Sequence, residues 1–264
     1  MAVTIKSARE IEFMREAGRI LAEVHEELGA FIRPGISTLD IDMLGEKLIR
    51  GYGCIPNFLN YQGYPASICV SVNNEVVHGI PNDSHILKDG DIVSLDAGLI
   101  YKGYHSDAAR THGVGTISED AKNLIAVTRQ SFFEGLKFVR PNNRVSDVSG
   151  AIQDYAESFG YSIVKEYTGH GVGRELHEDP EVPNYRTNRR GHRLAAGMAI
   201  AIEPMVNQGT ADIVLSNNKW TVYTKDGKLS AHYENTVIVT EGEPLIVTIC
   251  LLYTSPSPRD GATS

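Results

Sequence analysis

The stretch LKDGDIVSLDAGLIYKGYHSD, residues 87–107, contains the pattern from which we infer the fold. Its opening tetrapeptide ends in glycine and is followed by an apolar run that leads to Asp96. The tetrapeptide LAAG at 194–197 opens a similar run that leads to Glu203. The two carboxylates and the two tetrapeptides keep one offset (203 − 96 = 107 and 194 − 87 = 107). A fixed offset is typical of an internal duplication.

Two further landmarks keep this offset. Arg33-Pro34 is repeated as Arg140-Pro141, and Gly53 is repeated as Gly160. Because these landmarks share one register without a gap, we predict a duplicated α+β half, with the two halves packed about a pseudo-two-fold axis. Coincidence among common helix-stop residues is the alternative. A site to which both halves contribute would lie between them.

Each half is expected to begin with two helices followed by strands. In the first segment apolar residues recur at helical spacing, and Ser7 with Glu10 forms a capping box. Arg33-Pro34 ends that helix, and Ser37 opens the next. The expected helices are 7–31, 37–51, 118–139 and 145–159, and the expected strands are 67–72, 91–99, 199–202 and 237–249.

Composition places the chain among ordinary globular proteins and excludes several classes. Hydrophobic residues make up 42% and charged residues 22% of the 264 residues, and the net charge of −8 argues against nucleic acid as the main ligand. No apolar run approaches the roughly 20 residues that span a bilayer, and the N-terminus lacks the apolar core of a secretory signal. The three scattered cysteines fit a reducing, cytoplasmic setting.

We expect a single catalytic domain and a tail outside it. The last stretch is rich in Ser, Pro and Gly and has no periodicity, so it is interpreted as disordered or as a sequence artefact. The expected domain is 1–249, with halves of about 1–117 and 118–249, and the tail is 250–264.

Asp96 and Asp107 suggest a site for a cation. Lys102-Gly103 between them is a candidate hairpin turn, which would place the two aspartates roughly opposite each other. Cross-strand Cβ atoms lie about 5 Å apart. Two carboxylates at that separation repel unless a cation lies between them. Two exposed aspartates on a surface hairpin are the alternative.

Three more residues extend this set. His170 lies between glycines in GHGVG, Glu203 follows the apolar run MAIAI, and Glu234 precedes the apolar run TVIV. A glutamate buried at the end of a strand is costly without a partner. Four carboxylates balance the charge of two divalent cations, and a mostly oxygen ligand set with one imidazole suits Mn, Fe(II) or Co, and also Zn. Two such ions can activate water for hydrolysis.

The segments that carry these residues, together with the string VVHGIP around His78, closely resemble bacterial type I methionine aminopeptidases over about residues 1–249. These enzymes belong to the "pita-bread" metallohydrolases, whose fold has two related α+β halves around a central antiparallel sheet. The resemblance implies a metallo-exopeptidase with two divalent ions, Co2+, Mn2+, Fe2+ or Zn2+. It also implies removal of the N-terminal methionine when the second residue is small.

The resemblance assigns roles to individual residues. Asp96 would chelate one ion, Asp107 and Glu234 would bridge the two ions, and His170 and Glu203 would bind the other. Glu203 would also shuttle a proton. The histidines His78 and His177 would contact the substrate near the scissile bond, and His177 would donate to the developing oxyanion.

The family also has an apolar pocket for the methionine side chain. By its motifs, the pocket here would be formed by Tyr61, Tyr64, Cys69, Leu176 and Trp220. Leu176 stands where some bacterial members have Phe, and Gln62 where some have His.

The expected partners are the N-termini of nascent polypeptides, with the ribosome as a further candidate, no membrane and no specific nucleic acid. We expect a monomer. An Xaa-Pro peptidase of the same fold is the near rival, although those enzymes usually carry an extra N-terminal domain. A catalytically inactive binding protein on this fold is the rival of another class, and such proteins typically lose metal ligands.

Overall fold

The structure is a computed structural model in which residues 3–249 are described. Its helices are α1 (Ala8–Phe31), α2 (Thr38–Gly51), α3 (Glu119–Leu136) and α4 (Val145–Ser158), with a short 3-10 turn η1 (Tyr61–Gly63). Its strands are β1 (Ile55–Pro56), β2 (Ile68–Val72), β3 (Glu75–Val77), β4 (Ile92–Tyr101), β5 (Tyr104–Gly113), β6 (Ser162–Ile163), β7 (Gly169–Gly171), β8 (Glu178–Val182), β9 (Ala199–Ile202), β10 (Met205–Asn207), β11 (Ile213–Leu215), β12 (Val222–Thr224), β13 (Ser230–His232), β14 (Glu234–Ile238) and β15 (Leu245–Ile246).

The four helices begin close to where the sequence predicts. The Ser7 hydroxyl caps α1, and the Glu10 side chain accepts a hydrogen bond from the Ser7 backbone N–H, so the predicted capping box is confirmed. Ser37 and Asp40 form the same arrangement at the start of α2. Such caps satisfy backbone N–H groups that have no partner within the helix.

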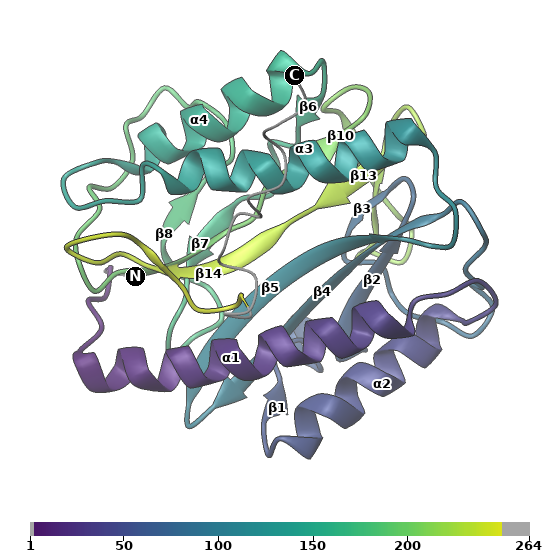
Figure 1. Ribbon diagram of the computed structural model, residues 1–264, viewed down its shortest axis with the longest axis horizontal. Coiled ribbons are helices and arrows are strands. Elements are labelled where there is room, and N and C mark those ends of the chain that lie inside the picture. Colours follow the sequence, from purple (N-terminus) through teal and green to yellow (C-terminus); the bar gives the residue numbers. More distant parts are fainter. Residues whose placement is uncertain (1–2, 250–264) are drawn as a thin grey trace, which may run out of the picture.

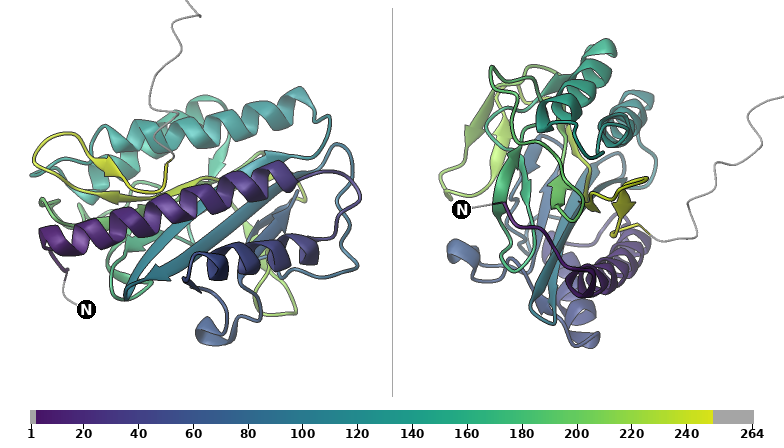
Figure 2. Two further views of the ribbon diagram at one scale, coloured as in Figure 1. Left: turned by 60° about the horizontal axis from the view of Figure 1, so that its bottom comes forward. Right: turned by 90° about the vertical axis from the view of Figure 1, so that its left-hand side faces the viewer.

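A curved sheet of nine strands forms the centre of the molecule. Its strand order is β1-β4-β5-β14-β9-β7-β8, with β2 pairing β4 and β15 pairing β14, and every pairing is antiparallel. The other strands form two small sheets, with the orders β13-β10-β6 and β11-β12-β3. All four helices cover the same face of the sheet, as the turned views in Figure 2 show. In Figure 1, α1 and α2 lie at the bottom of the picture, and α3 and α4 lie at the top.

The offset of 107 residues recurs in the element bounds. Helix α2 runs from Thr38 to Gly51 and α4 from Val145 to Ser158, so both ends keep the offset (145 − 38 = 107 and 158 − 51 = 107). Strands β1 and β6 keep it as well. The repeat therefore describes whole elements rather than isolated helix-stop residues.

Backbone hydrogen bonds repeat at the same offset. The Gly35 N–H donates to the Leu87 carbonyl at 2.9 Å, and the Asn142 N–H donates to the Leu194 carbonyl at 3.0 Å. Each bond ties the segment before the second helix of a half to the tetrapeptide that precedes strand β4 or β9. Both halves thus share this hydrogen bond as well as the sequence offset, which supports duplication over coincidence as the origin of the sequence pattern.

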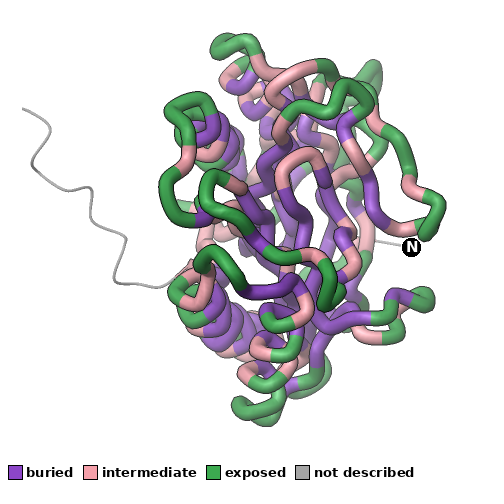
Figure 3. The backbone as a smooth tube through the Cα atoms, turned by 90° about the vertical axis from the view of Figure 1, so that its right-hand side faces the viewer, coloured by how far each residue is buried: buried purple, intermediate pink, exposed green. Residues whose placement is uncertain are grey.

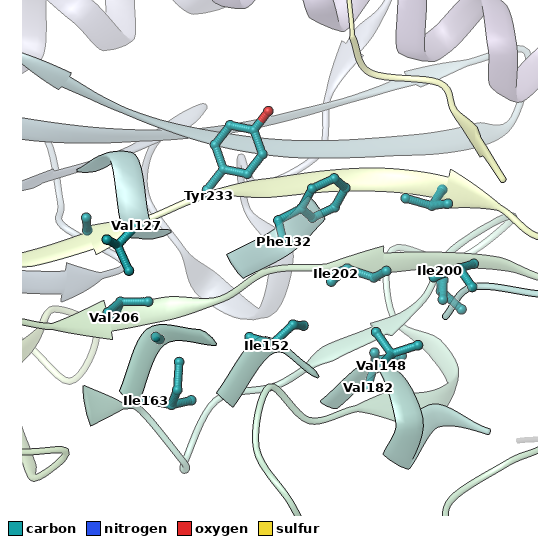
Figure 4. Packing of buried hydrophobic residues seen from close by; sticks show 14 of the residues in the cluster. Val127, Phe132, Val148, Ile152, Ile163, Val182, Ile200, Ile202, Val206 and Tyr233 are labelled. Atoms are coloured by element: carbon teal, nitrogen blue, oxygen red, sulfur yellow. The ribbon is translucent and has the colours of Figure 1, made fainter. Parts of the chain in front are cut away.

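Each helix pair covers an apolar core of its own. One core lies between α1, α2 and strands β2 and β4, and the other lies under α3 and α4. In the second core the rings of Phe132 and Tyr233 pack edge to face with centroids 5.4 Å apart (Figure 4). Figure 3 shows the buried strands enclosed by exposed loops and helix surfaces.

The predicted strand 237–249 is wrong as a single element. Strand β14 ends at Ile238, a turn at 240–243 reverses the chain, and β15 pairs back so that Val237 faces Ile246. The sequence EGEP at 241–244 accounts for the turn, because Gly and Pro interrupt a strand. The predicted tail 250–264 lies outside the described residues. Within 3–249, no helix is both long and apolar enough to cross a bilayer.

Candidate metal centre and active site

The hairpin β4–β5 carries the two aspartates on the same face of the sheet. Its turn is where the sequence predicts, since Tyr101 pairs with Tyr104 across Lys102-Gly103. The aspartates are not directly opposite, however. Asp96 pairs with Ala109, and Asp107 pairs with Gly98. They are therefore diagonal neighbours offset by two residues, which still lie within reach of a shared ion.

His170 is held in a strand rather than in a mobile loop. It lies on β7, pairs with Ala201 of β9 and is 8% exposed. A Cβ atom on Gly169 would lie 2.3 Å from the Ala201 carbonyl oxygen, and one on Gly171 would lie 2.2 Å from the Asp179 carbonyl oxygen. The flanking glycines thus permit close packing of neighbouring backbone around His170.

The tautomer of His170 follows from its contacts. Its Nδ1 lies 2.9 Å from the Gly171 carbonyl oxygen, so Nδ1–H is the donor there. Burial lowers the pKa of His170 to about 3. A neutral ring with its hydrogen on Nδ1 leaves the Nε2 lone pair free to bind a metal.

Glu203 and Glu234 reach the same place from β9 and β14. Glu203 follows the last residue of β9, and Pro204 separates that strand from β10. Glu234 opens β14 and pairs with Ala109 of β5, the residue that also pairs with Asp96. Adjacent strands of the central sheet therefore bring together acidic residues that are far apart in the sequence (Figure 1).

The distances define a compact cluster of possible ligands. Asp107, His170 and Glu234 each offer a ligand atom, and these atoms lie within 4.8 Å of one another. His170 Nε2 lies 3.6 Å from Glu203 Oε1 and 3.9 Å from Asp107 Oδ2. The spacing leaves room for an ion at the centre rather than for direct hydrogen bonds.

The electrostatics of this cluster favour a bound cation. One oxygen of each of Asp96, Asp107 and Glu234 is buried with no hydrogen-bond partner within residues 3–249. Burial raises the pKa of Asp96 to about 7. Burial, together with repulsion from neighbouring carboxylates, raises the pKa of Asp107, Glu203 and Glu234 well above the usual range. Two buried carboxyl groups (Asp107 and Glu234), two partly buried ones (Asp96 and Glu203) and a neutral imidazole thus fit a site for divalent metal ions.

The histidines His78 and His177 lie beside this cluster. The His177 ring is 4.3 Å from the His170 ring, centroid to centroid. His78 follows β3 and has a left-handed φ of 58°, a conformation that costs energy in a non-glycine residue and is often found at functional sites. Burial lowers the pKa of His78 to about 4, with a further contribution from His177, and burial lowers the pKa of His177 as well.

A cavity of about 180 Å³ includes the proposed ligands in its walls. The structure brings all the predicted site residues to its walls, namely Tyr61, Tyr64, Cys69, His78, Asp96, Asp107, His170, Leu176, His177, Glu203, Trp220 and Glu234. Its apolar side belongs to one cluster, in which Phe58, Tyr64, Ala66, Cys69 and Leu176 are buried and Tyr61, Ile80 and Trp220 are partly buried. The cavity therefore joins an apolar end to a carboxylate-rich end.

Four residues at the site were missed in the sequence. Phe58, Tyr167 and Thr168 also line the cavity, and Tyr167 packs edge to face on His78 with ring centroids 5.3 Å apart. His232 is 1% exposed, and its Nε2 lies 3.8 Å from Glu203 Oε2. Tyr167 and Thr168 directly precede GHG, which is a signal that was available. His232 lies two residues before Glu234, which is a comparable signal, whereas Phe58 is not next to any predicted ligand in the sequence.

The comparisons with known proteins agree with this geometry. The model of metallopeptidase family M24 matches residues 12–241. The chain belongs to metallopeptidase family M24. It is 51% identical over 248 residues to a protein named methionine aminopeptidase from Clostridium acetobutylicum, covering 94% of this chain and 99% of that protein. The crystal structure of methionine aminopeptidase from Rickettsia prowazekii matches with a TM-score of 0.92 at 40% identity, covering 94% of this chain and 100% of that chain.

Within family M24, the chain is a member of the methionine aminopeptidases, as its sequence resemblance predicts, and it has the pita-bread fold. The Xaa-Pro dipeptidase from Bacillus anthracis shares the fold with a TM-score of 0.75 at 26% identity, but the match covers only 62% of that longer chain. The M24 chain is therefore a metallo-aminopeptidase, and the Xaa-Pro peptidases are more distant relatives.

Proposed function

We propose that this M24 enzyme removes the N-terminal methionine of polypeptides whose second residue is small, by hydrolysis of the first peptide bond. The observation that carries the proposal is the cavity itself, which has an apolar wall at one end and the buried carboxylates at the other. Cys69 of the apolar wall pairs across β2 and β4 with Asp96, so the two ends are adjacent. A methionine side chain suits such a wall, because its thioether adapts to irregular apolar and aromatic surroundings.

Five residues would hold two divalent ions, drawn from Co2+, Mn2+, Fe2+ and Zn2+. Asp96 would hold one ion, His170 and Glu203 would hold the other, and Asp107 and Glu234 would serve both. Ions bound there supply Lewis acidity and activate water for attack near neutral pH. The unpartnered oxygens of Asp96, Asp107 and Glu234 are the structural support for this assignment.

The remaining steps belong to side chains around the cavity. Glu203 accepts the proton of the attacking water, because its carboxylate lies at the carboxylate-rich end of the cavity beside the proposed ions. His177 donates a hydrogen bond to the oxyanion that develops on the scissile carbonyl. His78, held at its left-handed φ, contacts the scissile amide nitrogen.

The substrate class follows from the dimensions of the site. A cavity of about 180 Å³ is large enough for one methionine side chain, and the second residue would lie beside His78 and His177 of the cavity wall, where we expect only a small side chain to fit. Nascent polypeptides in the cytoplasm supply such N-termini, and the ribosome is a further candidate partner. We propose a monomeric catalytic domain of residues 1–249, with halves of about 1–117 and 118–249.

The test is hydrolysis of a Met-Ala-Ser peptide by the purified chain. We expect no release of methionine after chelation and full release once Co2+, Mn2+ or Fe2+ is restored. An acetylated Met-Ala-Ser peptide is the matched control, because it lacks the free α-amine. Cleavage by protein shown to be metal-free by elemental analysis, or equal cleavage of the acetylated peptide, would refute the proposal.

A further inference from the structure

Tyr61 and His177 are far apart in the sequence, but their side chains meet at the edge of the cavity. Tyr61 Oη lies 2.7 Å from His177 Nδ1, and the ring centroids are 5.3 Å apart. His177 also contacts His170, with ring centroids 4.3 Å apart. The oxyanion donor of the proposed function is thus fixed between a tyrosine hydroxyl and a proposed metal ligand.

We propose that Tyr61 is a positioning residue for catalysis, whose hydroxyl donates to His177 Nδ1 and so keeps the ring hydrogen on Nε2. A neutral imidazole carries one N–H, and the hydrogen bond made by one nitrogen determines the state of the other. With Nδ1 acting as acceptor, Nε2 is the nitrogen that can donate to an oxyanion. This inference rests on the proposed function and deepens it, because it gives the Tyr61 hydroxyl a role separate from that of its ring in the methionine pocket.

The backbone around Tyr61 holds the hydroxyl in place. Asn60 and Gln62, on either side of it, have left-handed φ values of 66° and 49°. The loop is closed by hydrogen bonds from Asn60 N to the Tyr64 carbonyl at 2.8 Å and from Tyr61 N to the Phe58 carbonyl at 2.9 Å. Asparagine tolerates this conformation, but it is costly for Gln62, and such strain is found where a loop must present a side chain in one orientation.

Tyr64 provides a comparison within the same pocket. Its ring also lines the cavity, but its hydroxyl donates to the Gly79 carbonyl oxygen at 2.8 Å and does not contact His177. The two tyrosines therefore share a wall of the pocket and differ in what their hydroxyls bind. Removing each hydroxyl while keeping the ring separates positioning of His177 from binding of methionine.

The kinetic test is a double-mutant cycle on the metal-loaded enzyme with Met-Ala-Ser as substrate. Tyr61→Phe should lower kcat by roughly 3- to 10-fold, the worth of one hydrogen bond, with KM little changed because the ring remains. In the His177→Ala background the same substitution should cause no further loss. Tyr64→Phe should instead have the same effect in both backgrounds. An unchanged kcat in Tyr61→Phe, or an equal loss in both backgrounds, would overturn the inference.

A second readout does not depend on activity. In the Zn2+-loaded protein with 15N-labelled histidine, the ring nitrogens of His177 should report hydrogen on Nε2 in the wild type and in Tyr64→Phe. Tyr61→Phe should lose this single tautomer, and an unchanged spectrum would contradict the inference. If the wild type fails to cleave Met-Ala-Ser with metal bound, the proposed function fails, while the spectra still decide whether Tyr61 sets the tautomer.

Discussion

The Lys6 ammonium lies 2.6 Å from the Glu178 carboxylate, one residue beyond His177, and the two side chains are 5% and 8% exposed. The other oxygen of Glu178 accepts the Arg174 N–H at 2.8 Å, so this carboxylate ties the N-terminal segment to the loop that carries His177. We expect Lys6→Met to destabilise the protein by about 3 kcal/mol, because it leaves a buried carboxylate without its cation. Urea unfolding measures the loss.

Lys122 provides a matched control for this prediction. Its ammonium is also 2.6 Å from a carboxylate, that of Glu119, but the two side chains are 53% and 80% exposed. Lys122→Met should change stability by less than about 1 kcal/mol, because solvent screens an exposed pair. Equal losses in Lys6→Met and Lys122→Met would show that burial of the Lys6 pair is unimportant.

The Lys6 pair also predicts how stability changes with pH. Burial alone would raise the pKa of Glu178. Hydrogen bonds from Lys6 and Thr4, together with the charge of Lys6, hold that pKa below its usual value of 4.5. A carboxylate whose pKa is lowered by folding stabilises the folded state at pH values above its ordinary, unfolded pKa. This contribution is lost as the pH falls through the lowered pKa of the folded state. The difference in Tm between wild type and Lys6→Met should therefore narrow as pH falls from 7 to below 4.5. A constant difference would argue that Glu178 is not the partner.

The carboxylate cluster predicts an opposite trend in metal-free protein. Burial raises the pKa of Asp96 from 3.8 to about 7, so its protonated form stabilises the fold at low pH, and this contribution is lost as pH rises through about 7. After chelation, Tm should fall between pH 5.5 and 8, and added divalent metal should remove the trend. Asp96→Asn should weaken the trend in metal-free protein. The same pH profile with and without metal would contradict a metal site at this cluster.

The two neighbouring histidines should respond differently to substitution. His170→Ala should lower the bound metal measured by elemental analysis, because the substitution removes a proposed ligand. His177→Ala should keep its metal but lower kcat by roughly 10²-fold, as expected when an oxyanion donor is lost. Loss of metal from His177→Ala would show that the roles of the two residues had been exchanged.

The sequence was sufficient to predict residues that the fold brings to one cavity, but not the contacts that support them. The turn at Lys102-Gly103 could be predicted from residue type alone, and it brings Asp96 and Asp107 to one face. The two-residue offset between these aspartates could not be predicted, because it depends on how the two strands pair at the turn. Contacts such as Tyr61 with His177 join loops more than a hundred residues apart (177 − 61 = 116), and no local pattern encodes them.

The last prediction concerns the residue that follows methionine in the substrate. The carbonyl under attack must lie beside His177 while the next residue passes His78, whose left-handed backbone limits its movement. Peptides that begin Met-Ala, Met-Gly, Met-Ser, Met-Thr, Met-Pro or Met-Val should be cleaved, whereas Met-Leu, Met-Lys and Met-Glu should not. A misfit in a rigid site displaces the carbonyl, and a displacement of about 1 Å can cost roughly 10²-fold in rate. Comparing kcat/KM for Met-Ala-Ser and Met-Leu-Ser tests this directly, and similar values would show that space beside His78 does not control specificity.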